Sequence, residues 1–212
     1  MSNQKQVNEK RKAILAAAER VFASSGYASA TVEAVAEDAG VAKGSIYNYF
    51  ESKEDLFVQV FLEAMAIQSA QADRLVEEDL SATEKLNQLL DDWYVRLGEY
   101  QRISRLILEV WAVTARHERK GKLEHILRRM YAEWSGRLAA IISQGIRRGE
   151  FDAQADAGSA ARLIMATGDG ATMYSVLDTG MVIDEKFLGA FKRAIASSLA
   201  PRDRDRDVGA HR

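Results

Sequence analysis

Apolar residues recur with the spacing of an α-helix along almost the whole chain. Ile14, Ala18 and Phe22 follow an i, i+4, i+8 spacing, which places them on one helix face. Gly26 comes next, and we expect it to end this first helix in a left-handed conformation. No segment of useful length alternates apolar and polar residues, as a half-buried strand would. The pattern predicts an all-α fold of about nine helices, three short ones followed by six longer ones.

Capping and turn residues mark where the predicted helices begin. Thr31 precedes the segment "VEAVAED" and is expected to cap a short second helix. Gly40 marks a tight turn, after which "VAKGSIYNYF", residues 41–50, forms a third helix. Ser52 and Asp55 have the spacing of a capping box, as do Ser81 and Glu84 further along. We therefore expect a long fourth helix to begin at about residue 53.

The chain divides into three predicted parts. Residues 1–52 form a three-helix headpiece, and residues 53–200 form a larger helical bundle that ends in helices at roughly 155–178 and 185–200. Residues 201–212, "PRDRDRDVGAHR", alternate in charge and have almost no apolar content. Such a segment cannot bury enough apolar surface to fold, so this tail is expected to be disordered.

The headpiece has the outline of a helix-turn-helix, whose second helix lies in the major groove of DNA. A glycine permits close approach of the backbone, lysines supply positive charge, hydroxyl groups donate to phosphate oxygens, and an amide contacts a base edge or a phosphate. The residues expected to contact DNA on these grounds are Lys43, Gly44, Ser45, Tyr47, Asn48, Tyr49 and Lys53. Ile46 and Phe50, one turn apart, are expected to pack inward.

Each of these residues also has a plainer interpretation. A lone glycine in a helix is usually tolerated at a cost of about 1 kcal/mol. A tyrosine on a small helix is more often a core residue with an exposed hydroxyl, and a lone lysine is usually only solvated. The order and spacing of the residues after a glycine-containing turn favour the DNA-binding interpretation.

Residues 31–61, "TVEAVAEDAGVAKGSIYNYFESKEDLFVQVF", resemble the DNA-binding signature of the TetR (tetracycline-repressor) family. The resemblance covers about residues 10–65 and implies that the seven residues above touch DNA. It also implies that Thr31 bonds a phosphate. Ala42 departs from the family, which often has serine or threonine there, and the missing hydroxyl weakens the cap of the third helix by about 1 kcal/mol.

The resemblance implies a ligand-responsive transcriptional regulator, usually a repressor, that a small and largely apolar effector releases from a palindromic operator. A palindrome also calls for a homodimer, because two headpieces must be held about 34–36 Å apart or a multiple of that distance. Apolar stripes on the last two helices either close the chain's own core or form this interface, and the resemblance favours a four-helix interface. The predicted interface residues are Leu163, Tyr174, Leu177, Phe187, Phe191 and Ile195.

Aromatic and methionine residues gather between the headpiece and the last two helices. Such residues at helical spacing more often form an ordinary core. Three tryptophans also suit an apolar cavity between helices, where the family binds its effector. The predicted effector residues are Trp93, Tyr94, Ile107, Trp111, Met130, Trp134, Met165, Asp169 and Met173.

Charge and motif content narrow the alternatives. The net charge is -2, and residues 1–58 hold seven basic and eight acidic residues, which argues against non-specific nucleic-acid binding. There is no cysteine, no His-based metal or di-iron motif, no phosphate-binding glycine loop and no serine elbow, so we expect no catalytic site, metal or cofactor. Without a secretory signal or an apolar run of about 18 residues, the protein is expected to be cytoplasmic and not bound to a membrane.

Overall fold

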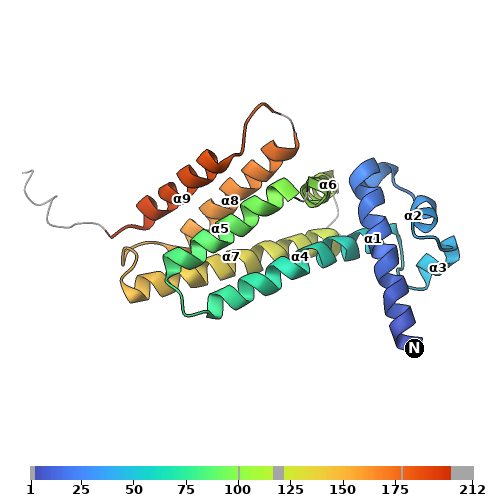
Figure 1. The fold of residues 1–212 in the computed structure, drawn as a ribbon, viewed down its shortest axis with the longest axis horizontal. Helices are drawn as coiled ribbons and strands as arrows, with labels where there is room; N and C mark the ends of the chain where they lie inside the picture. The colour runs from blue at the N-terminus through green and yellow to red at the C-terminus, as the bar shows by residue number, and fades with distance from the viewer. Residues whose placement is uncertain (1–2, 100, 117–121, 178, 202–212) are drawn as a thin grey trace, which may run out of the picture. The chain divides into compact units, whose positions relative to one another are not determined.

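The computed structural model describes residues 3–99, 101–116, 122–177 and 179–201. Within these ranges the chain forms nine α-helices and no strand (Figure 1). The helices are α1 (Asn3–Ser29), α2 (Val32–Asp38), α3 (Lys43–Tyr47), α4 (Lys53–Glu77), α5 (Ala82–Glu99), α6 (Gln101–Arg116), α7 (Lys122–Arg148), α8 (Ala157–Val176) and α9 (Glu185–Leu199). The predicted all-α fold is confirmed, whereas the predicted disordered tail lies, from residue 202 on, outside the described residues.

The chain divides into two compact units. The first unit comprises residues 1–70 and 100–128, and the second comprises residues 71–99 and 129–212. The predicted headpiece is therefore one part of the first unit, which also includes α6. The helices α4 and α7 contribute residues to both units. The functional boundary predicted at residue 52 stays a prediction.

Aromatic side chains from two helices pack together in the core of the first unit. The rings of Phe22 on α1 and Phe57 on α4 meet edge to face, with centroids 5.0 Å apart. The ring of Tyr27 lies 4.7 Å from Phe57 and 6.1 Å from Phe22. Edge-to-face pairs of this kind stabilise a core beyond the apolar area that they bury. They fix the C-terminal part of α1 against the beginning of α4.

Gly26 stops the first helical segment of α1, as predicted. It has the expected positive φ, 73°, with a ψ of 161°, and a short second helical segment follows it within α1. Helical hydrogen bonding resumes directly, because the Ala30 amide donates to the Gly26 carbonyl at 3.1 Å. The amide of Tyr27 instead donates to Glu109 on α6, at 3.1 Å from Oε2. A side chain from a distant helix thus satisfies the backbone group that the break exposes, which local sequence did not reveal.

The second unit is built on an apolar core from α4, α5, α7, α8 and α9. Lys85 on α5 is 1% exposed in this unit. Its ammonium donates to the Val76 carbonyl at 2.7 Å and to Gln144 Oε1 at 2.9 Å, and the Gln144 amide also donates to Val76 at 3.2 Å. Carbonyls in the last turn of a helix have no partner within that helix. Lys85 and Gln144 therefore tie the end of α4 to α5 and α7.

The predicted helix caps are confirmed. Thr31 Oγ1 accepts a hydrogen bond from the Ala34 amide at 3.1 Å, and Ser52 Oγ accepts one from the Asp55 amide at 3.0 Å. Ser81 and Glu84 bond reciprocally through side chain and backbone. These short-range contacts define where the helices begin, as the sequence predicted.

Gly145 on α7 provides a test of packing in the second unit. A Cβ atom at this position would lie 2.3 Å from Phe151 Cδ2 and 2.8 Å from Ala82 Cβ, closer than atoms can pack. We expect Gly145→Ala to lower the free energy of unfolding by about 1–3 kcal/mol because the core must shift. Urea denaturation measures this change.

Gly136 provides the matched control on the same helix. A Cβ atom there would meet no heavy atom within 4 Å, so only the higher helix propensity of alanine acts. We expect Gly136→Ala to leave stability unchanged or raise it by up to about 1 kcal/mol. Equal destabilisation by both substitutions would contradict this account of the packing at Gly145.

Candidate DNA-binding surface and effector region

The turn between α2 and α3 has a compact backbone. Gly40 has a φ of 65°, a conformation that side-chain-bearing residues rarely adopt. The Val41 amide then donates to the Ala36 carbonyl at 2.9 Å, which closes the end of α2. Ala42 occupies the N-cap of α3 and offers no side-chain hydrogen bond, as the sequence predicted. The third helix is therefore positioned by the turn and by its packing.

Two buried side chains orient α3. Ile46 and Phe50 are 1% and 2% exposed, and the Phe50 amide donates to the Ile46 carbonyl at 3.0 Å. Because these side chains face the core, the opposite side of the helix faces solvent. The exposed residues in the range 43–48 are Lys43, Gly44, Tyr47 and Asn48, of which Gly44 and Asn48 lie opposite Ile46. Ser45 and Tyr49 are half-buried between the two sides.

Both predicted DNA-contacting lysines interact with neighbouring groups of the first unit. Lys43 forms an ion pair with Glu33 on α2, and both side chains are at least half exposed. This hydrogen bond raises the pKa of Lys43 and lowers the pKa of Glu33. The Lys53 ammonium donates to the Ala28 carbonyl at 3.1 Å and lies 4.7 Å from the centre of the Tyr27 ring. Each lysine is thus engaged by neighbouring groups of the first unit.

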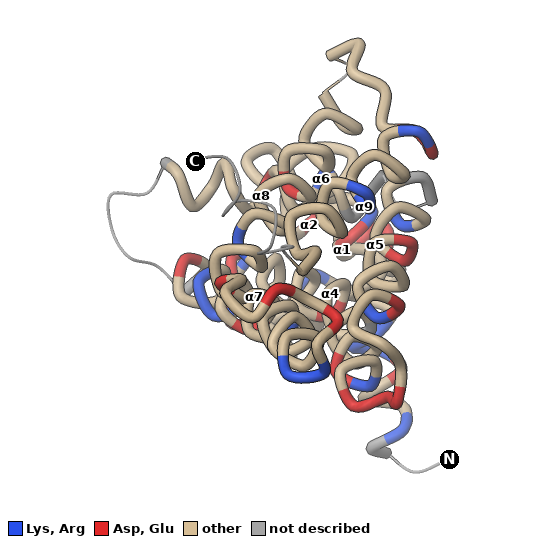
Figure 2. Tube along the Cα trace, turned by 90° about the vertical axis from the view of Figure 1, so that its left-hand side faces the viewer, with Lys and Arg blue, Asp and Glu red and all other residues tan. Residues whose placement is uncertain are grey.

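Charge is not concentrated on one face of the helices. Lysine and arginine positions are interspersed with aspartate and glutamate positions along the described chain (Figure 2). Arg20 on α1, for example, pairs with Asp38 at the end of α2, at 2.5 Å. Thr31 is exposed and has its hydroxyl oxygen bonded to the α2 backbone, so only its hydroxyl hydrogen is available to a phosphate. Favourable DNA contacts must therefore come from a few specific side chains.

The predicted effector residues lie in both units. Ile107 and Trp111 belong to α6 in the first unit, and the other seven belong to the second unit. That all nine surround one cavity stays a prediction. Within the second unit, Trp93 on α5 meets Phe191 on α9 edge to face at 6.2 Å. Its indole N–H donates to the hydroxyl of Thr172 on α8 at 3.4 Å.

A hydrogen bond between α7 and α8 brings a carboxyl group into this region. The Tyr131 hydroxyl donates to Asp169 Oδ2 at 2.7 Å. Burial raises the pKa of Asp169, and the Tyr131 hydrogen bond partly offsets this by lowering it. No cation pairs with Asp169 among the residues that the structure describes. Met165 and Met173 lie one helical turn on either side of Asp169 and share its face of α8.

The remaining predicted effector residues are half-buried. Trp134 on α7 has the Arg137 guanidinium 5.3 Å from its ring centre, and Arg137 in turn bonds Asp73 at 2.6 Å and 3.0 Å. Tyr94 and Met130 are partly covered as well. Tyr131, the partner of Asp169, was missed by the sequence reasoning. Its place beside Met130 and three residues before Trp134 is the signal that could have included it.

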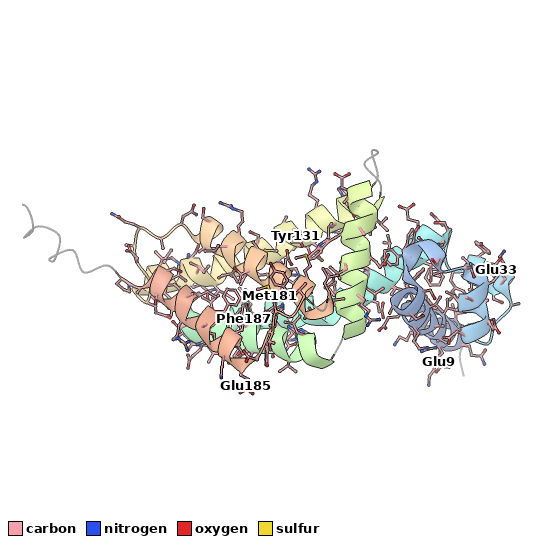
Figure 3. The ribbon with its side chains drawn as sticks, turned by 90° about the horizontal axis from the view of Figure 1, so that it is seen from above. Glu9, Glu33, Tyr131, Met181, Glu185 and Phe187 are labelled. Carbon is pink, nitrogen blue, oxygen red and sulfur yellow. The ribbon has the colours of Figure 1, made fainter. Side chains whose placement is uncertain are left out.

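An apolar groove runs between α8 and α9, which lie side by side (Figure 1). Its volume is about 340 Å³. Leu163 is 62% exposed here, whereas Phe191 and Ile195 are each 8% exposed and belong to the unit's own core. Phe187, near the start of α9, is labelled in Figure 3 and also lines the groove. Tyr174 is half-buried, and Leu177, at the end of α8, is 52% exposed.

These features define a class of protein: a helix-turn-helix DNA-binding regulator with an all-α C-terminal part. Comparison with known families agrees. Residues 14–60 match the family model described as "Bacterial regulatory proteins, tetR family", and residues 82–200 match "BetI-type transcriptional repressor, C-terminal". The chain therefore belongs to the TetR family of bacterial transcriptional regulators, as its sequence resemblance predicted.

Individual relatives are similar over most of their length. The chain is 28% identical to the fatty acid metabolism regulator protein of Bacillus subtilis over 86% of its own length and 89% of that protein. It is 28% identical to the transcriptional repressor BepR of Brucella suis, over 74% and 76%. The crystal structure of FadR from Bacillus subtilis in complex with stearoyl-CoA is 25% identical, with a TM-score of 0.75 over 89% of this chain and 98% of that one.

None of the helices within the described ranges is both long and apolar enough to cross a bilayer.

Gly44 provides a test that separates DNA contact from folding. A Cβ atom there would meet nothing within 4 Å of it, so Gly44→Ala is not expected to lower stability. If the DNA backbone approaches this position, the added methyl group weakens binding. We expect the dissociation constant for a specific duplex to rise at least tenfold, about 1.4 kcal/mol, with an unchanged melting temperature.

The same exchange at a site in the second unit is the control. Gly136→Ala adds a methyl group at another position that is free of contacts and lies on α7. Fluorescence anisotropy measures the dissociation constants of both variants. The duplex is one that the wild-type protein binds in the presence of excess unrelated DNA. Wild-type affinity of the Gly44→Ala protein would show that DNA does not approach Gly44.

Proposed function

We propose that the protein is a ligand-responsive repressor that binds a palindromic operator as a homodimer and is released by a small, largely apolar effector. It would act in the cytoplasm and without enzymatic activity. One observation carries the proposal: α3 buries Ile46 and Phe50 and turns Lys43, Gly44, Tyr47 and Asn48 to solvent. Hydroxyl and lysine contacts to phosphates would position the protein without selecting a sequence. Sequence specificity would therefore come from Asn48 and from the backbone at Gly44, which could approach the DNA closely.

Homodimer formation would use the groove between α8 and α9. The exposed Leu163 and the groove's apolar lining supply the kind of surface that a monomer rarely leaves uncovered. In a symmetric dimer the same surface of each chain meets its counterpart. Two headpieces joined in this way could read both halves of a palindrome.

The effector would bind near the Tyr131–Asp169 hydrogen bond. Trp93, whose indole N–H bonds Thr172 three residues after Asp169, and Met165 and Met173, one helical turn on either side of Asp169, would supply apolar and polarizable surface there. A Cβ atom at Gly170 would meet nothing within 4 Å, so packing does not require a glycine beside Asp169. The Bacillus subtilis FadR structure contains stearoyl-CoA. By analogy, we propose an effector with a long apolar portion.

Release would follow from a difference in effector affinity between two conformations. The effector would bind more tightly to a conformation whose headpieces are wrongly spaced for DNA. It can weaken DNA binding only by the difference between its binding free energies for the two conformations, typically about 1–3 kcal/mol. The helix α4 contributes residues to both units, and Lys85 and Gln144 hold its last turn. This continuous helix is the proposed route by which effector binding reaches the headpiece.

A gel shift tests the proposed function. The protein is mixed with the DNA upstream of its own gene and an excess of unrelated DNA. We expect specific retention, which weakens as salt increases with a slope that corresponds to a handful of phosphates. Stearoyl-CoA is the first effector probe, and a true effector should raise the melting temperature and release the duplex. Loss of binding to the competitor would instead favour non-specific nucleic-acid binding.

Leu163 tests the proposed dimer. We expect Leu163→Glu to convert the dimer to a monomer, because a carboxylate buried in an apolar interface is strongly unfavourable. Folding should survive, since Leu163 is 62% exposed within the chain itself. Sedimentation measures the mass, and Ala132→Glu, at an exposed position of α7, is the control. A Leu163→Glu protein that sediments as a dimer would exclude this interface.

A further inference from the structure

A carboxylate of α6 closes the break in α1. The Tyr27 amide, which follows the non-helical Gly26, donates to Glu109 Oε2 at 3.1 Å. Glu109 Oε1 would lie 2.9 Å from a Cβ atom at position 26, so a side chain there would require the Glu109 carboxylate to shift. The positive φ of Gly26 and the position of the Glu109 carboxylate are therefore matched. Both residues belong to the first unit.

The segment after the break holds Lys53 in place. The Lys53 ammonium donates to the carbonyl of Ala28 at 3.1 Å and lies 4.7 Å from the centre of the Tyr27 ring. An ammonium near the face of an aromatic ring is attracted by the negative charge of that face. The Tyr27 ring is itself fixed 4.7 Å from Phe57. Residues 26–29 therefore provide two of the contacts that place the Lys53 ammonium.

These contacts form one connected series. It leads from the Glu109 carboxylate through the Tyr27 amide to the Tyr27 ring and the Ala28 carbonyl, and from there to Lys53. We propose that Glu109 and Tyr27 are positioning residues for Lys53, so that α6 controls how this lysine meets an operator phosphate. This inference rests on the proposed function, in which Lys53 contacts DNA.

The alternative is that Glu109 acts on DNA only through its charge. A carboxylate weakens DNA binding through repulsion of the phosphates, whatever its hydrogen bonds. The two accounts predict opposite results for two conservative substitutions. Glu109→Gln keeps a carbonyl oxygen at the same reach and removes the charge, whereas Glu109→Asp keeps the charge and withdraws the oxygen by one methylene group.

Affinity for the duplex retained in the gel shift is measured over a range of salt concentrations. We expect Glu109→Asp to weaken operator binding about three- to tenfold. The slope of log affinity against log salt concentration should also become shallower, towards the slope of Lys53→Met. That variant lacks one phosphate contact, which contributes about 0.9 to the slope. Glu109→Gln should bind within about twofold of the wild type. Tighter binding by Glu109→Gln together with wild-type binding by Glu109→Asp, which is the result that phosphate repulsion alone predicts, would overturn the proposal.

A double-mutant cycle provides a second, independent readout. If Glu109 acts through Lys53, the Glu109→Asp, Lys53→Met double variant should bind no more weakly than Lys53→Met alone. Effects that multiply would show that Glu109 acts by another route, such as general stability, and would overturn the proposal. Glu63→Asp, an exposed position on α4, is the matched control and should leave affinity and slope unchanged.

Different results would contradict the proposed function and the positioning role. Absence of specific operator binding by the wild-type protein would contradict the proposed function itself. Specific binding by the wild type, with independent effects of Glu109 and Lys53, would leave that function intact and exclude only the positioning role.

Discussion

The burial of Ile46 and Phe50 is the constraint on which the candidate DNA-binding surface depends. These two side chains are one turn apart, so their contact with the core of the first unit fixes the rotation of α3 about its own axis. Ala42 adds no side-chain cap to this helix, and α3 itself is only five residues long. A helix this short has little stability of its own. Its position therefore comes from these buried contacts and from the turn at Gly40, and a change in either would move every exposed group on the opposite side.

Three cations of the first unit are engaged by other groups of the chain before any DNA is present. Lys43 pairs with Glu33, Arg20 with Asp38, and Lys53 with Ala28 and the Tyr27 ring. A DNA phosphate must compete with these contacts or add to them. The binding free energy gained when it meets such a cation is therefore smaller than with a cation that has no partner. Such competition lowers affinity for all DNA alike and leaves selectivity to groups that meet a correctly shaped site. This competition is consistent with the net charge of -2 of the chain. It also distinguishes this surface from that of a basic protein, which binds any nucleic acid through its excess positive charge.

Short-range signals made much of the fold predictable. The caps at Thr31, Ser52 and Ser81, and the turn at Gly40, depend on residues within a few positions of one another, and each lies where the sequence placed it. The inward direction of Ile46 and Phe50 followed from helical spacing alone. The unpredicted features join distant segments: Glu109 meets Tyr27 across 82 positions, and Tyr131 meets Asp169 across 38. One sequence carries no information on which remote side chain satisfies an exposed amide or a half-buried carboxyl group.

The apolar stripes on α8 and α9 can serve both of the roles considered for them, closing the chain's own core and forming a dimer interface. Phe191 and Ile195 are buried in the core of the second unit and also line the groove, whereas Leu163 contributes its surface mainly to the outside. One stripe can therefore close the chain's own core and support a second chain from beneath. In that arrangement a change that shifts the core around Trp93, which packs on Phe191, is passed to the groove without any intervening loop. Packed side chains have only a few alternative arrangements, so a shift around Trp93 moves its neighbours from one arrangement to another. An effector held near Trp93 could in this way alter the angle between two chains, and with it the spacing of the headpieces that they carry.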